Sequence, residues 1–230
     1  MSVTKAAWVS ATAGDARVRV KLCGMFRPQD IEVANAVRPD YVGFVVDFPR
    51  SHRSVPADDV AALSSQVDAG IRRVGVFVDE PVEVVARLYR QGAIDVAQLH
   101  GREDEAHLAQ LRNACDVPTI QAFRVREAAD VAHAVASTAD LVLLDNGQGT
   151  GESFDWSLVR EVGRPFVLAG GLTPANVADA IAAVRPWGVD MSSGIETDGV
   201  KDSSKMRAAV AAVRTAGGGA FPADFQEGAL

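Results

Sequence analysis

The chain has 230 residues, of which 48% are hydrophobic and 23% are charged, a composition sufficient for one domain with a full core. Its net charge of −7, with no run of Lys or Arg, argues against a nucleic-acid or anionic-membrane partner, so any anionic ligand must be held by local groups. Two cysteines, Cys23 and Cys115, are too few for a disulfide framework and fit a reducing cytoplasm.

The two ends of the chain differ in composition from the rest. Residues 1–16 carry one Lys and no long apolar run, so they fit neither a signal peptide nor a membrane span, and we expect a flexible extension. Residues 217–230 open with three consecutive glycines and predict a flexible tail. Residues 17–216 are expected to form a single ordered domain.

Eight apolar, β-rich runs alternate with eight amphipathic helical windows in this domain. The runs begin near Val18, Tyr41, Arg73, Ile94, Pro118, Asp140, Pro165 and Trp187. The helical windows cover residues 30–37, 57–67, 82–89, 103–112, 128–136, 155–161, 175–184 and 203–213. Continuous apolar strands such as "YVGFVV" and "LVLLD" suit a parallel sheet that is covered on both faces.

Eight such βα units predict the α/β class and a single (β/α)8 TIM barrel. A doubly wound open sheet is the alternative, but that fold usually has fewer strands, and no glycine fingerprint follows the first strand here. In a barrel the chemistry lies where strands run into the following loops, so strand-end residues are the candidates for the site.

Small residues at the ends of the seventh and eighth strands predict a phosphate site. Gly170 and Gly171 end the seventh strand, and Ser193 and Gly194 follow the eighth. Backbone N–H groups in two neighbouring loops can cradle a phosphate without a lysine, although either motif alone could be a tight turn. The loops after the third and fourth strands, "VDEPVE" and "HGREDE", are acidic, so we expect one phosphate per substrate.

A thiol and a carboxyl group end two other strands. Cys23 ends the first strand and Asp145 ends the sixth. Their reference pKa values are about 8.5 and about 4, so moderate shifts could make Cys23 a base and Asp145 an acid. An isomerase requires such a pair. Alternatively, Asp145 caps the loop that follows it. Cys115 is interpreted as a small buried hydrophobe, and Asp190 as a loop or barrel-layer residue.

The loop "DFPRSHRSV" contains Arg50 and Arg53, and a guanidinium group there could clamp a carboxylate, with ordinary surface charge as the alternative. His100, at the end of the fourth strand, could contact substrate or form a hydrogen bond within the barrel. No cluster of His, Cys and carboxylate residues has metal-ligand spacing, so we expect no metal.

Seven stretches, in order, resemble the phosphoribosylanthranilate isomerase family of tryptophan biosynthesis. They are "VKLCGMFRPQD", "DYVGFVVDFPRSHRSV", "RVGVFVD", "DVAQLHG", "LLDNGQGTGESFDW", "LAGGLTPANV" and "VDMSSGIETDGVKD". The resemblance implies a cytoplasmic enzyme that performs an Amadori rearrangement of N-(5-phosphoribosyl)anthranilate without a cofactor. It also implies that Cys23 is the general base, that Asp145 is the general acid and that Arg53 contacts the anthranilate carboxylate.

Some departures and alternatives remain open at the level of sequence. The loop after the second strand is one residue longer than is usual in the family, so either Arg50 or Arg53 could be the residue that binds the carboxylate. Gln121, expected at the pocket wall, stands where many members have lysine. The nearest rival is the histidine-pathway isomerase, which acts on a two-phosphate substrate, and a silent metabolite-binding barrel is the other. The expected partner is a small phosphorylated molecule, and the chain is expected to be a monomer or a homodimer.

Overall fold

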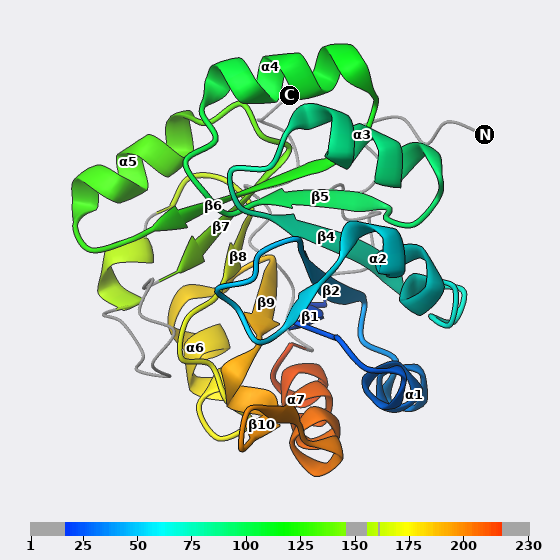
Figure 1. Cartoon of the computed structure of the whole chain (residues 1–230). Helices are drawn as coiled ribbons and strands as arrows, with labels where there is room; N and C mark the ends of the chain where they lie inside the picture. The colour runs from blue at the N-terminus through cyan, green and yellow to red at the C-terminus, as the bar shows by residue number, and fades with distance from the viewer. Residues whose placement is uncertain (1–16, 146–155, 161, 218–230) are drawn as a thin grey trace.

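Eight parallel strands close into a barrel in the computed structural model, which describes residues 17–145, 156–160 and 162–217 (Figure 1). The strands are β1 (Arg19–Cys23), β2 (Tyr41–Val46), β4 (Arg72–Phe77), β5 (Val96–Leu99), β6 (Thr119–Arg124), β7 (Leu141–Asp145), β8 (Phe166–Leu168) and β9 (Gly188–Met191). The barrel is closed because β1 pairs in parallel with both β2 and β9. The predicted (β/α)8 barrel is therefore confirmed.

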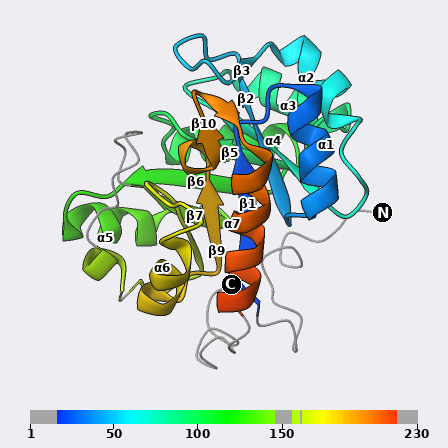
Figure 2. The same cartoon turned by 90° about the horizontal axis from the view of Figure 1, so that it is seen from below.

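Helices form the outer layer around the strands (Figure 1). They are α1 (Pro28–Val37), α2 (Ala57–Ser64), α3 (Val82–Arg90), α4 (Glu105–Ala114), α5 (Ala128–Ala136), α6 (Val177–Val184) and α7 (Ser203–Ala216). Helix α7 packs against both α6 and α1, so the last helix closes the outer layer beside the first (Figure 2). No helix in the described ranges is long and apolar enough to cross a bilayer.

Three details differ from the sequence-based expectation. The window at residues 155–161 contains, in its described part, only the short 3₁₀ helix η2 (Trp156–Val159), since Gly163 and Pro165 follow soon after and interrupt a longer helix. A short strand, β3 (Ser54–Val55), extends the β2 edge. The loop after β9 folds into η3 (Ser193–Ile195) and a hairpin of β10 (Glu196–Thr197) and β11 (Val200–Lys201).

The two ends of the chain lie outside the described residues, except at the boundary. Gly217, expected to begin the tail, instead ends α7, where its N–H donates to the Val213 carbonyl at 2.7 Å. A Cβ at Gly217 would lie 3.1 Å from Val18, so this residue packs against the start of the barrel. The predicted extension at 1–16 and the tail beyond residue 217 are not described.

Side chains of each strand alternate between the two faces of the sheet, which gives two apolar layers. On β1, Val20 and Leu22 pack outward in the cluster beneath the helices. Cys23 belongs to the cluster that fills the barrel interior. At the amino-terminal ends of the strands, Tyr41 and Trp187 are both buried with ring centroids 6.0 Å apart, and they form the floor of this interior.

Candidate active site

Cys23 lies at the carboxyl end of β1 and is 7% exposed. Its register partner on β2 is Gly43, where a Cβ would come within 2.8 Å of the Cys23 sulfur. The chain turns directly after the thiol at Gly24, whose φ of +78° favours glycine. The Arg53 side chain covers this turn, since a Cβ at Gly24 would lie 2.5 Å from Arg53 Cδ. The thiol and Arg53 are therefore neighbours.

Burial and the neighbouring lysines shift the pKa of Cys23 in opposite directions. Burial raises the pKa of the Cys23 thiol above its ordinary value, because an anion is poorly solvated there. The positive charge of Lys21 is the strongest influence in the other direction, with a smaller contribution from Lys201. The balance leaves the pKa raised, so this group is mainly the neutral thiol at neutral pH.

Asp145 lies at the carboxyl end of β7, and its side chain is 21% exposed. The nearest imidazole atom is Nε2 of His100, at 3.7 Å from the carboxylate. The other ring nitrogen of His100, Nδ1, lies 2.9 Å from the amide nitrogen of Gln98, so Gln98 holds the ring with Nε2 toward Asp145. The loop that Asp145 was alternatively expected to cap lies outside the described residues.

The loops after β8 and β9 pack directly on one another. Gly170 and Gly171 both have positive φ, of 86° and 65°. A Cβ at Gly194 would lie only 2.0 Å from the Leu172 carbonyl oxygen, so the two loops meet there without room for a side chain. Asn176 holds the first loop, because its amide donates to the Gly171 carbonyl at 2.9 Å.

The backbone N–H groups of this pair of loops remain available for a ligand. Among the described residues, none of the four predicted phosphate contacts has a backbone N–H donating to a protein acceptor: Gly170, Gly171, Ser193 and Gly194. Glycines in the left-handed region expose such groups to one side of the chain. The arrangement suits a phosphate bound by main-chain donors.

Arg53 forms a two-pronged ion pair with Glu196 at the same end of the barrel. Its Nε and Nη2 donate to the two carboxylate oxygens at 2.6 and 2.5 Å, and Lys201 Nζ donates to Oε1 at 2.6 Å. Burial alone would raise the pKa of Glu196, but the hydrogen bonds from Arg53 and Lys201 lower it to about 2. Arg50, by contrast, is exposed on the turn before β3.

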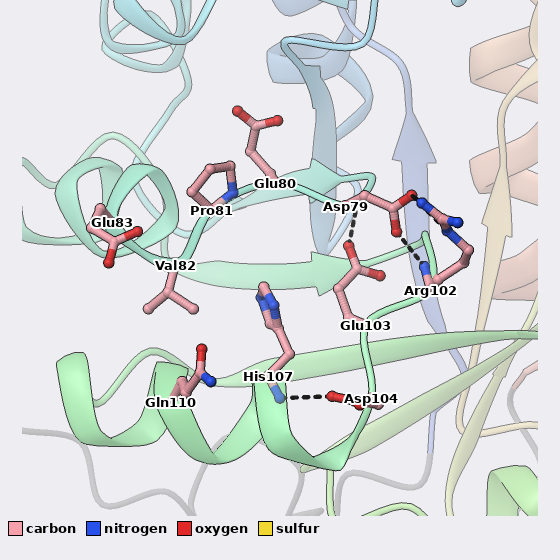
Figure 3. A pocket seen from close by; sticks show the side chains of 10 residues that line it. All are labelled: Asp79, Glu80, Pro81, Val82, Glu83, Arg102, Glu103, Asp104, His107 and Gln110. Carbon is pink, nitrogen blue, oxygen red and sulfur yellow. Dashed lines mark hydrogen bonds and ion pairs between the residues drawn. The ribbon is translucent and has the colours of Figure 1, made fainter.

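The opposite side of the barrel mouth has a pocket of about 530 Å³ between the loops after β4 and β5 (Figure 3). Glu103 fills the anion-binding positions of these loops itself, since it accepts from the Asp79 and Gly101 N–H groups at 2.8 and 2.7 Å. Asp79 in turn accepts from the N–H of Arg102 at 2.6 Å. Carboxylates thus occupy the donors that a second phosphate would need.

Comparisons with known proteins show the family to which the chain belongs. A family-wide sequence profile described as N-(5'phosphoribosyl)anthranilate (PRA) isomerase matches residues 20–212. The chain belongs to this family. The N-(5'-phosphoribosyl)anthranilate isomerase of Lacticaseibacillus casei is 41% identical over 189 residues, which cover 82% of this chain and 91% of that protein.

Two solved structures of the isomerase family share the fold. One is a phosphoribosyl anthranilate isomerase in complex with reduced 1-(o-carboxyphenylamino)-1-deoxyribulose 5-phosphate; it has a TM-score of 0.76 and 33% identity and covers 86% of this chain and 99% of that one. The other, with the same values, shows monomers generated from the dimeric isomerase of Thermotoga maritima. The family confirms the predicted class of enzyme, an isomerase of tryptophan biosynthesis that acts on a small phosphorylated substrate.

Sequence reasoning missed or misplaced several polar residues of this isomerase fold. Glu196 and Lys201 lie within the stretch "VDMSSGIETDGVKD", but neither was predicted to be a site residue. A Glu and a Lys five residues apart across a short turn could have suggested an ion pair. Gln121, expected at the pocket wall, points away from the barrel interior and bonds the Glu103 carbonyl at 2.7 Å and Ser137 Oγ at 2.5 Å. Its position on β6 alternates with Ile120, which faces the interior.

Proposed function

We propose that this chain converts N-(5-phosphoribosyl)anthranilate into 1-(2-carboxyphenylamino)-1-deoxyribulose 5-phosphate, with Cys23 as general base and Asp145 as general acid. The observation that carries the proposal is the placement of a thiol and a carboxyl group at the ends of β1 and β7, at one barrel mouth that also holds open main-chain donors. The family match makes this substrate the first to test.

The proposed reaction consists of two proton transfers. Asp145 protonates the ring oxygen of the ribose, and the ring opens to a Schiff base. Cys23 as thiolate then removes the proton from C2′, and the electron pair of the broken C–H bond moves toward the nitrogen to give an enolamine. The enolamine tautomerises to the ketone. His100, with Nε2 at 3.7 Å from the carboxylate, is placed to influence the proton transfer by Asp145.

The two ends of the substrate are anchored by different groups in this proposal. The phosphate binds the N–H groups around Gly170, Gly171, Ser193 and Gly194. Arg53 binds the anthranilate carboxylate through Nη1, because Glu196 already holds Nε and Nη2. Hydrogen bonding to Glu196 raises the pKa of Arg53, so the guanidinium stays charged.

The direct test follows the anthranilate-like fluorescence of freshly generated substrate. We expect Cys23→Ala and Asp145→Asn each to lower kcat by about two to four orders of magnitude, the usual contribution of one acid or base. Cys115→Ala is the matched control and is expected to keep wild-type turnover. Near wild-type rates in both site variants would refute the assignment. Substrate binding by calorimetry without turnover in the wild type would instead indicate a silent barrel.

The carboxylate contact is tested in the same assay. Arg53→Ala is expected to raise KM by about tenfold or more, as expected for the loss of a charge-assisted hydrogen bond. Arg50→Ala is the matched control, because Arg50 is an exposed arginine of the same loop. An unchanged KM in Arg53→Ala would argue against the clamp, and a raised KM in Arg50→Ala alone would move it to Arg50.

The two-phosphate isomerase substrate of the histidine pathway is the main alternative. Among the described residues, Glu103 already accepts from main-chain donors on the other side of the mouth, which favours a substrate with one phosphate. We therefore expect no measurable turnover of that substrate. A cytoplasmic location and a monomeric or homodimeric state remain part of the proposal, and sedimentation of the purified chain would determine the latter.

A further inference from the structure

Lys21 and Asp190 form a buried ion pair inside the barrel. They are register partners on the adjacent strands β1 and β9, and the Lys21 ammonium lies 2.7 Å from Asp190 Oδ2. Their side chains are only 4% and 8% exposed, and Asp190 Oδ1 has no hydrogen-bond partner among the described residues. A buried pair of this kind costs desolvation energy and could be replaced by apolar side chains without loss of stability. Its presence calls for a role other than holding the barrel together.

The pair lies directly beside the thiol. Lys21 and Cys23 are two residues apart on β1, so both side chains point into the barrel. They meet over Gly43, where a Cβ would lie 2.8 Å from the Cys23 sulfur and 3.2 Å from Lys21 Nζ. Glycine at this position leaves the space in which the ammonium and the sulfur approach each other.

The charges around the sulfur do not cancel while the thiol is protonated. Three cations act on it, and two carboxylates are bound to those cations; the five residues are Lys21, Lys201, Arg53, Asp190 and Glu196. Two more titratable groups lie beside Glu196: His52, half-exposed at 3.8 Å from its carboxylate, and Lys205, whose Nζ donates to its backbone carbonyl at 2.6 Å. The set has one positive charge in excess, and a thiolate would neutralise it.

We propose that Lys21 is a positioning residue for the proton-transfer step, in which its ammonium stabilises the Cys23 thiolate while Asp190 holds the ammonium against the barrel wall. The inference rests on the proposed function in one respect, namely that the Cys23 thiolate acts as the general base. Burial alone would lower the pKa of Lys21, but Asp190 and Cys23 together raise it, so Lys21 remains charged at neutral pH.

The proposal gives the two members of the pair opposite effects on the thiol. Without Lys21, the thiolate would face Asp190 with no intervening cation, and the thiol becomes harder to ionise. Without the charge of Asp190, the thiolate becomes the nearest counter-ion of Lys21, and the thiol becomes easier to ionise. A residue that acts only through packing would not produce shifts of opposite sign.

The test is a pH titration of thiolate ultraviolet absorbance in a Cys115→Ser background, with the Cys23→Ser protein subtracted. We expect the midpoint to rise by about one pH unit or more in Lys21→Met and to fall by a similar amount in Asp190→Asn. The double variant Lys21→Met/Asp190→Asn, which buries no unpaired charge, should titrate above wild type and below Lys21→Met. Arg207→Met, at an exposed arginine of α7, is the control for loss of one positive charge.

The outcomes separate this inference from the proposed function. Should Lys21→Met fail to fold by circular dichroism, the double variant and Asp190→Asn still decide it. Midpoints that stay at the wild-type value, or that move in the same direction in the folded variants, overturn the role of Lys21 even if Cys23→Ala is inactive. Shifts of opposite sign with a fully active Cys23→Ala would support the electrostatic pairing while refuting Cys23 as the base.

Discussion

The two sides of the barrel mouth use their backbone N–H groups in opposite ways. In the loops after β8 and β9, Gly170 and Gly171 hold positive φ, and their donors face no protein acceptor among the described residues. In the loops after β4 and β5, Glu103 and Asp79 accept hydrogen bonds from the equivalent main-chain groups. One side is left open to an external anion, and the other is satisfied by the protein's own carboxylates.

This difference shows how an acidic chain can bind a phosphate. The phosphate side contains a carboxylate too, but Glu196 is neutralised by Arg53 and Lys201. On the other side Asp79 pairs with Arg102, whose side chain is 89% exposed, and a solvated pair of that kind contributes little. We expect local saturation of donors, rather than net charge, to decide where an anion binds.

Among substitutions that test this difference between the two sides of the mouth, Gly194→Ala is expected to have the largest effect. The new methyl group would lie 2.0 Å from the Leu172 carbonyl oxygen, so the two loops must separate. We expect KM to rise by about tenfold or more and the free energy of unfolding to fall by about 1–3 kcal/mol, the usual cost of overpacking. Gly163→Ala, where a Cβ meets nothing within 4 Å, is the control for kinetics and denaturant unfolding.

A second prediction concerns the neutralised carboxylate. The pKa of Glu196 falls from 4.5 to about 2 on folding, so its stabilisation is present above pH 4.5 and is lost as the pH falls toward 2. Glu196→Gln should therefore be less stable than wild type near pH 6, by up to about 3 kcal/mol, and the difference should shrink through that acidic window.

Urea unfolding at several pH values measures this difference, with Glu83→Gln on the exposed side of α3 as the control. A stability difference that is constant from pH 6 down to pH 2 would show that the Glu196 carboxylate is not selectively stabilised in the folded chain.

The smallest effect is expected on the opposite side of the mouth. Glu103→Ala removes the acceptor for two N–H groups in a partly exposed loop, which should cost about 1 kcal/mol of stability. Turnover and KM should stay within about twofold of wild type, because the proposed binding mode places no substrate group there. Thermal melting and the fluorescence assay check both statements, with Glu83→Ala for comparison. A large rise in KM would mean that this side also contacts substrate.

The strands and their ends could be predicted from sequence because parallel strands that are buried on both faces have nearly continuous apolar sequences. Cys23 and Asp145 stand out for the same reason, since each is a titratable group at the end of such a run. The hairpin after β9 was missed, although Asp198-Gly199 at its tip is a strong turn signal, and both residues have positive φ, of 51° and 76°.

The polar pairs of the site were harder to predict because each joins distant parts of the chain. Lys21 and Asp190 are separated by 169 residues, and only the closure of β1 on β9 places them in register. Arg53 and Glu196 are 143 residues apart and meet above the turn at Gly24. The lysine two positions before the thiol was visible in the sequence, but its partner could be found only from the three-dimensional fold.

The aromatic floor of the barrel also has a kinetic consequence. Tyr41 and Trp187 close the amino-terminal end beneath Lys21, and Arg19 covers the Trp187 ring at 5.9 Å. Cys23 lies at the opposite end of β1 and is only 7% exposed, and the proposed substrate would cover it from the mouth. A proton taken from C2′ would then exchange slowly with bulk water while the substrate is bound, so part of a deuterium label at C2′ should be carried through to the product.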